Sequence, residues 1–331
     1  MMAEEQPHEI VWTLTNAVIP SRCLHVVAEL GVADEVGGDP VGVAELASRC
    51  GADRDALDRV LRLLAAHGIF ERHPDGYAHT EASLLLRSDH PKSMRALARM
   101  MGLPVFGATF NALEHSVRTG SPAVELVTST GLWPYLQDHP SEAEVFGQAM
   151  TAKAAADTAA ILAAYDFTRF DTIADIGGGR GHLLGAILDA APNAQGILFD
   201  LPEVIGSLVI EDERLTPQAG DFFVDALPTA DAYVLMEVIH DWADPECIAI
   251  LSAISRASSQ AATVLVIEDV MPDDQPDVRS QTLDVIMLSV TGGRERTVSQ
   301  LGELFDRSGF RLTGVTETAG AMRLVEGTRL P

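Results

Sequence analysis

The sequence predicts an α/β protein with a doubly wound sheet and, before it, a mostly helical domain. Three observations predict this fold. A glycine-rich turn at 177–181 joins a short apolar run to an amphipathic helical pattern. The later apolar runs 231–239 and 263–267 are each followed by an ionisable residue. Strand-like and helix-like segments alternate over this half, as they do when helices cover both faces of a parallel sheet.

The glycine turn is the centre of the predicted site. The apolar residues of 172–176 indicate a buried strand, and a helical pattern begins directly after the turn. Gly177, Gly179 and Gly181 give the spacing G-x-G-x-G, which lets a ligand approach the backbone closely. A dinucleotide fingerprint would need glycine where His182 stands, and the Gly-Lys-Ser/Thr of a phosphate-binding loop is missing.

Two carboxylates accompany the turn. Asp175 lies in the strand before it, and Asp200 ends the next apolar stretch, 196–200. An acid at the end of the second strand can bind both hydroxyls of a ribose. Together with Gly177, these acids favour a nucleoside ligand without a phosphate cradle, and S-adenosylmethionine fits that description. The alternative is a tight turn with a purely structural role.

Composition limits the partners and the compartment. The 331 residues suffice for two domains, and the net charge of -25 disfavours nucleic acid and anionic membranes as partners. Three scattered cysteines indicate a reducing compartment and lack the spacing of a zinc site, so no metal is expected. With no signal-peptide pattern and no long apolar run, we expect a cytoplasmic protein that does not span a membrane.

The N-terminal third has a winged-helix pattern. A helix over 9–30, interrupted near Pro20, precedes helices at 43–47 and 54–67 and a pair of short strands around Pro74-Asp75-Gly76. A DNA-binding helix should present a basic face, but the arginines of 54–62 alternate with aspartates. We therefore expect packing or dimerisation here, with a DNA-binding regulator that senses a small molecule as the alternative.

The domain boundary is expected at residue 95. Residues 1–95 would form the winged-helix-like dimerisation domain and 96–331 the catalytic domain. Within the latter, 96–165 reads as helical and 166–331 as a Rossmann-like core closed by a hairpin of strands at 310–315 and 322–325.

His240 is the candidate catalytic base. It follows the apolar strand 231–239, and the carboxyl ends of such strands build the sites of open α/β sheets. Asp244 is expected to cap the helix that follows, and Glu268 stands directly after the next strand. A histidine with only a structural hydrogen bond is the alternative. In the loop 220–223, Asp221 and Phe222 could hold the edge and the face of an adenine.

Taken together, the motifs resemble those of small-molecule O-methyltransferases of the caffeic-acid type, which are class I methyltransferases, and especially their actinobacterial relatives in polyketide tailoring. The order and spacing match over nearly the whole chain. The matching segments are Asp-Ile-Gly-Gly-Gly-Arg-Gly at 175–181, Phe-Asp-Leu-Pro at 199–202, Gly-Asp-Phe-Phe at 220–223, His-Asp-Trp at 240–242 and Gly-Gly-Arg-Glu-Arg-Thr at 292–297.

The resemblance implies a set of site residues. His240 would be the general base that deprotonates an acceptor hydroxyl, with Glu268 and Glu295 orienting it. S-adenosylmethionine would contact Asp175, Gly177, Gly179, Asp200, Leu201, Asp221 and Phe222. The acceptor would contact Phe146, Met150, Asp241 and Met287. Plant members carry a cofactor-binding lysine where this chain has Met236.

The resemblance also implies a homodimer through the N-terminal domain, whose first helices lend residues to the partner's pocket. The expected acceptor is an aromatic or polyketide-like natural product of secondary metabolism, as in antibiotic biosynthesis. Two alternatives use the same scaffold: methylation of nitrogen, and hydroxylation or decarboxylation in place of methyl transfer.

Overall fold

The computed structural model describes residues 6–272 and 277–331, which divide into two compact units. The first comprises the described part of Met1–Gly107 together with Glu144–Lys153. The second comprises Ala108–Ala143 and the described part of Ala154–Pro331. The units are interleaved along the chain, and the functional boundary at residue 95 stays a prediction.

The first unit begins with α1 (Pro7–Asn16) and α2 (Val18–Glu29), followed by α3 (Val43–Cys50) and α4 (Arg54–Ala66). The strands β1 (Phe70–His73) and β2 (Gly76–His79) form an antiparallel hairpin. As expected, the carboxylate of Asp53 caps α4 by accepting the N–H of Ala56. Apolar side chains of α2, α3, α4 and the hairpin share one core.

The first two helices break at Ala17 rather than at Pro20. Proline is tolerated in the first turn of a helix, where its missing N–H would have no partner, so Pro20 lies inside α2. Within the part of the chain that the structure describes, Pro7–Glu29 is the one stretch whose length and apolar composition would suffice to cross a membrane. It is not a continuous apolar run, because polar residues such as Asn16 and Arg22 interrupt it. Little of it is buried, and α1 itself buries no residue.

A series of helices links the hairpin to the sheet. The longest is α11, which begins at Pro140, where proline suits the first helical turn, and ends at Ala164. The helices are α5 (Glu81–Leu84), α6 (Arg95–Met100), α7 (Pro104–Asn111), α8 (Leu113–Thr119), α9 (Val124–Thr128), α10 (Leu132–Asp138) and α11 (Pro140–Ala164).

The second unit contains a sheet of seven strands within the described residues, in the order β5-β4-β3-β6-β7-β9-β8. Neighbouring strands from β5 to β7 are parallel, and β9 is antiparallel to both β7 and β8. The strands are β3 (Thr172–Ile176), β4 (Gln195–Asp200), β5 (Leu215–Ala219), β6 (Ala232–Met236), β7 (Thr263–Glu268), β8 (Phe310–Glu317) and β9 (Arg323–Arg329).

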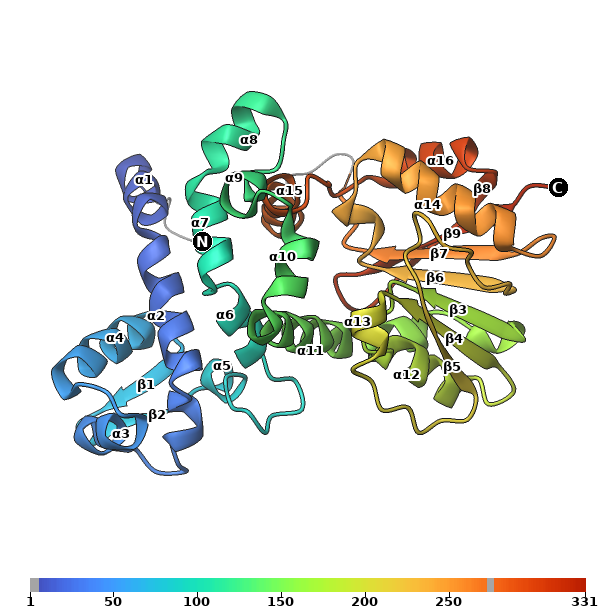
Figure 1. The fold of residues 1–331 in the computed structure, drawn as a ribbon. Helices are drawn as coiled ribbons and strands as arrows, with labels where there is room; N and C mark the ends of the chain where they lie inside the picture. The colour runs from blue at the N-terminus through green and yellow to red at the C-terminus, as the bar shows by residue number, and fades with distance from the viewer. Residues whose placement is uncertain (1–5, 273–276) are drawn as a thin grey trace. The chain divides into compact units, whose positions relative to one another are not determined.

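Helices cover both faces of this sheet (Figure 1), which confirms the doubly wound α/β class. The apolar sides of α14 (Asp244–Ala257) and α16 (Val298–Arg307) pack on one face. Side chains of α12 (His182–Ala190), with Ile161 of α11, pack on the other. The remaining helices of this half are α13 (Pro202–Ile205) and α15 (Val278–Val290). Because β3 and β6 are adjacent, their carboxyl ends meet at one edge.

Two local expectations were wrong. The strand expected over 231–239 ends at Met236, because Glu237 adopts a positive φ of 55° and the chain turns into a short 3-10 helix, Ile239–Asp241. Asp244 is not the N-cap of α14. The cap is Ala243, and the carboxylate of Asp244 instead binds the guanidinium of Arg296.

Candidate active site

The glycine turn has the backbone that its composition suggests. Gly177, Gly179 and Gly181 all have positive φ, between 58° and 75°, which side-chain-bearing residues rarely adopt. Gly178 is required for a different reason: a Cβ there would lie 2.4 Å from the carboxyl carbon of Asp175. Beside Gly179, by contrast, a Cβ would meet nothing within 4 Å. The turn therefore leaves open space beside its backbone at Gly179.

The two predicted acids flank this turn. The carboxylate of Asp200 accepts the N–H of Gly179 at 2.8 Å and that of Leu201 at 2.7 Å. Asp175 is 2% exposed, and its Oδ2 has no hydrogen-bond partner among the described residues. Burial, together with the charge of Asp200, raises the pKa of Asp175 to about 7. Burial also raises the pKa of Asp200, although the two N–H donors oppose that shift.

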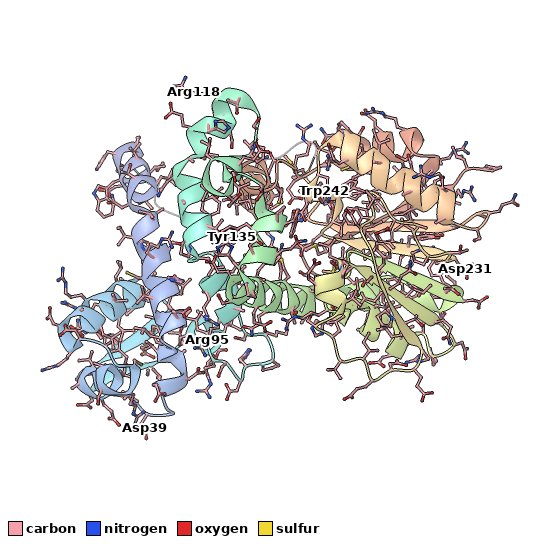
Figure 2. All side chains as sticks on the ribbon, in the orientation of Figure 1. Asp39, Arg95, Arg118, Tyr135, Asp231 and Trp242 are labelled. Atoms are coloured by element: carbon pink, nitrogen blue, oxygen red, sulfur yellow. The ribbon has the colours of Figure 1, made fainter. Side chains whose placement is uncertain are left out.

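Aromatic rings reach the same turn. Phe222 comes within 3.8 Å of the position that a Cβ on Gly177 would take. Its ring meets Trp242 edge-on at 5.8 Å between centroids, and Phe223 meets the same indole at 4.7 Å. Asp221 accepts the N–H of Phe223 and so holds this loop. In Figure 2, Asp231, which precedes β6, and Trp242, which follows it, lie at opposite ends of the strands. The aromatic group therefore lies at the carboxyl ends of the strands.

His240 lies between two buried acids. Its Nδ1 bonds Oε1 of Glu295 at 2.8 Å, and its backbone N–H donates to Oε1 of Glu268 at 2.9 Å. All three residues are at most 6% exposed. A carboxylate accepts only, so Nδ1 carries the hydrogen, and the lone pair of a neutral ring is on Nε2. The second oxygen of Glu295, Oε2, has no partner among the described residues.

The charges around His240 shift its proton affinity. Burial lowers the pKa of the imidazole, but the hydrogen bond to Glu295 and the charges of Asp241 and Glu268 outweigh it and raise the pKa to about 10. Burial raises the pKa of Glu268 to about 7, although the charge of His240 acts against that shift. The group thus combines a strong proton acceptor with a carboxyl that titrates near neutrality.

The other predicted contacts are spread over several elements. Asp241 places Oδ1 3.9 Å from Nε2 of His240. Met287 is half-buried on α15, and its backbone oxygen accepts the hydroxyl of Thr291. Phe146 and Met150 are half-buried on α11, within the stretch that groups with the first unit. Their contact with an acceptor stays a prediction.

Two further residues, which the sequence did not single out, contact Glu295 or the turn that carries His240. Asp284 on α15 accepts the backbone N–H of Glu295 at 2.9 Å. Arg296 is 1% exposed and bonds the turn that carries His240. The motif 292–297 held a signal for Arg296, because it places a second charge directly beside Glu295.

The residues at the glycine turn fit an adenosyl group. An unpartnered buried oxygen on Asp175, open space beside Gly179 and a carboxylate at the end of β4 all meet at one edge. Within residues 6–272 and 277–331, no group of three or more histidines, cysteines or acids has the arrangement of a metal site.

Comparisons with known proteins agree with this geometry. The family model described as an O-methyltransferase domain matches residues 110–311, and the model described as an O-methyltransferase dimerisation domain matches residues 12–89. The phenazine O-methyltransferase PhzM of Lysobacter antibioticus is 39% identical over 92% of each chain.

Two other relatives have names that give a different methylated atom or a different acceptor from those of the phenazine O-methyltransferase. The 8-amino-8-demethylriboflavin N,N-dimethyltransferase of Streptomyces davaonensis is 35% identical over 92% of this chain and 90% of its own. The solved structure of NcsB1, an O-methyltransferase from neocarzinostatin biosynthesis, holds S-adenosylmethionine and 2-hydroxy-5-methyl naphthoic acid. It superposes with a TM-score of 0.79 at 33% identity, covering 94% of this chain and 96% of that one.

Proposed function

From the premise that this chain belongs to the family of S-adenosylmethionine-dependent O-methyltransferases with an N-terminal dimerisation domain, we propose that it methylates a phenolic hydroxyl of an aromatic natural product, with His240 as general base. The observation that carries the proposal is the buried Glu295–His240 hydrogen bond at the carboxyl edge of the sheet.

The chemistry needs a base at this position. A phenol has a pKa of about 10 and is a weak nucleophile while protonated. Glu295 holds Nδ1–H of His240, so Nε2 of the neutral ring can accept the phenolic proton as the oxygen attacks. The raised pKa of His240 makes its neutral ring a stronger acceptor for the phenolic proton than an ordinary imidazole.

The cofactor would be held by residues of the second unit. S-adenosylmethionine, when bound, supplies an electrophilic methyl group. Asp200 is suited to the two ribose hydroxyls, and Asp221 and Phe222 to the edge and face of the adenine. Asp175, Gly177, Gly179 and Leu201 would line the turn, and the open space beside Gly179 leaves room for a ligand there.

The acceptor class follows from the relatives and the expected pocket. Phenazine and naphthoate rings, which the names of relatives give, are flat and aromatic. We propose that Phe146, Met150 and Met287 contact such a ring and that Asp241 binds a polar group on it. Secondary metabolism of the antibiotic-forming type is the corresponding biological setting.

Nitrogen is the second candidate acceptor, because a relative of 35% identity is named as an N,N-dimethyltransferase. A neutral amine carries its own lone pair and needs the base less than a phenol does. Replacement of His240 by alanine would therefore abolish O-methylation but leave most N-methylation, which separates the two candidates.

The dimerisation-domain match supports a homodimer. Helices α1 and α2 expose an apolar face that an identical partner could cover, and we propose that these helices also contribute to the partner's pocket. The exposed large apolar residues of these helices are Ile10, Val11, Trp12, Leu14, Val18, Ile19 and Val26. The three cysteines are free thiols, in accord with a cytoplasmic location.

The deciding experiment compares His240→Ala with the exposed control His67→Ala. Products formed from labelled S-adenosylmethionine and a panel of hydroxylated phenazines and naphthoates are measured by mass spectrometry, and cofactor affinity by calorimetry. We expect His240→Ala to lose about 10² to 10⁴-fold in rate while it keeps its cofactor affinity. Equal turnover in both variants would remove His240 from the mechanism.

A further inference from the structure

The segment Gly293–Arg296 lies directly against the turn that carries His240. A Cβ on Gly293 would come within 1.9 Å of the backbone oxygen of His240, so only glycine permits this approach. The next residue, Arg294, donates its backbone N–H to the same oxygen at 2.8 Å. Glu295 then bonds the imidazole. Three successive residues thus contact one histidine.

Arg296 extends this contact to the backbone on both sides of the histidine. Its Nη1 donates to the oxygen of Ile239 at 3.0 Å, and its Nη2 donates to the oxygen of Trp242 at 2.8 Å. The same guanidinium bonds Oδ1 of Asp244 through Nη2 at 2.8 Å and through Nε at 3.2 Å. One side chain therefore joins the beginning of the 3-10 turn, its end and the first residue of α14.

The burial of Arg296 makes these bonds consequential. It is among the largest fully buried side chains of the described residues, while Asp244, its ion-pair partner, keeps 45% of its side chain exposed. A planar guanidinium with five donors can satisfy three carbonyl oxygens, those of Ile239, Arg294 and Trp242, together with a carboxylate, whereas an ammonium group offers three donors from one point. Lysine at this position could not reproduce the set.

We propose that Arg296 is a positioning residue for methyl transfer. It holds the backbone on both sides of His240, so that Nδ1 stays on Glu295 and Nε2 keeps one direction toward the acceptor. This inference rests on the proposed role of His240 and goes beyond it, because Arg296 acts through the turn and not on the substrate. The turn needs such a restraint because Glu237 directly after β6 has a positive φ, which ends the strand before the histidine.

The test uses Arg296→Lys in the full-length protein, with Arg307→Lys as the matched control. Arg307 is an exposed arginine in the last turn of α16. We expect Arg296→Lys to lower kcat about 10 to 100-fold, as displacements near 1 Å do, with KM and cofactor affinity within about twofold of the parent. Arg307→Lys should match the parent in all three.

A second readout separates positioning from a merely structural role. If the turn shifts, the hydrogen bond to Glu295 weakens and the pKa of His240 falls, so the rising limb of the kcat profile moves to lower pH. The ring nitrogens of a ¹⁵N-histidine-labelled sample should titrate at lower pH in the same variant. A structural role alone would reduce the yield of folded protein and leave both titrations unchanged, which would overturn the inference.

A third variant keeps the inference testable if Arg296→Lys does not fold. Asp244→Ala removes one anchor of the guanidinium and leaves its contacts with the carbonyl oxygens of Ile239, Arg294 and Trp242, so we expect a smaller loss of kcat and a smaller shift in the same direction. An unshifted titration in this variant would also overturn the inference. Full activity of His240→Ala would instead refute the proposed function, whereas an inactive His240→Ala with unshifted titrations in Arg296→Lys would refute the positioning role alone.

Discussion

His240 and Glu295, which are 55 positions apart in the chain, are joined by a hydrogen bond of 2.8 Å between Nδ1 and Oε1 in a buried environment. The bond fixes which ring nitrogen carries the hydrogen and raises the proton affinity of the other. Its consequences for catalysis and for pH dependence can be measured separately.

Glu295→Gln should shift the pH profile and lower the rate. Glu295 raises the pKa of His240, so its removal moves that pKa down from about 10. The imidazole becomes neutral at lower pH, and the rising limb of kcat moves to lower pH. The plateau falls roughly 10² to 10⁴-fold, because the base is weaker and its tautomer is no longer fixed. Initial rates from pH 6 to 10.5 provide the measurement, and a profile that overlays the parent would contradict the role of Glu295.

Asp175→Asn should flatten the dependence of stability on pH. The pKa of Asp175 is raised from an ordinary value of 3.8 to about 7, so the folded state binds this proton more tightly than the unfolded state. The associated stability is present below pH 4 and is lost as the pH rises through 7, by roughly 4 kcal/mol at most. Asparagine does not ionise and removes this loss.

Urea unfolding of the cofactor-free protein at pH 5 and pH 8 provides that measurement. The difference in unfolding free energy between the two pH values should be smaller in Asp175→Asn than in the parent. Asp171→Asn, at an exposed position four residues earlier, is the control and should keep the difference of the parent. Equal differences in all three proteins would show that Asp175 ionises at its ordinary pKa.

The strands that build the site were predictable because they are apolar and because a glycine turn or a charged residue marks where each one ends. β3, β4, β7 and the closing hairpin lie where the sequence placed them. β5 was missed because Leu-Thr-Pro-Gln-Ala is short, polar and contains proline, as an edge strand permits. A hydrophobic pattern therefore finds central strands better than edge strands.

The contacts of charged side chains were less predictable than the strands. The spacing of Asp244-Pro245 is typical of a helix cap, but the carboxylate binds Arg296, which lies 52 positions later. Likewise, the positive φ of Glu237 has no marker in the local sequence, because glutamate, unlike glycine or asparagine, does not favour that conformation. Long-range ion pairs and single unusual dihedrals are tertiary properties that local propensity does not encode.

Gly178→Ala should weaken cofactor binding, because the new Cβ would lie 2.4 Å from the carboxyl of Asp175 and 2.6 Å from Cδ1 of Leu198. The turn must shift to relieve these overlaps, and the backbone beside Gly179 moves with it. We expect S-adenosylmethionine affinity to fall at least tenfold by calorimetry. Gly185→Ala in α12, whose Cβ would meet nothing within 4 Å, should keep the affinity and stabilise the helix by about 0.5–1 kcal/mol. Unchanged affinity in Gly178→Ala would contradict the assignment of the turn.

Trp12→Glu should weaken the proposed homodimer. Trp12 is 65% exposed on α1, a helix that buries no residue of its own, so the apolar face is stable in water only if a partner covers it. A carboxylate on that face would be desolvated in the interface. We therefore expect the dissociation constant of the dimer to rise at least 100-fold. Val117→Glu, 73% exposed on α8, is the control and should leave the dimer intact. Light scattering and sedimentation over a concentration series measure both, and an unchanged dimer in Trp12→Glu would place the interface elsewhere.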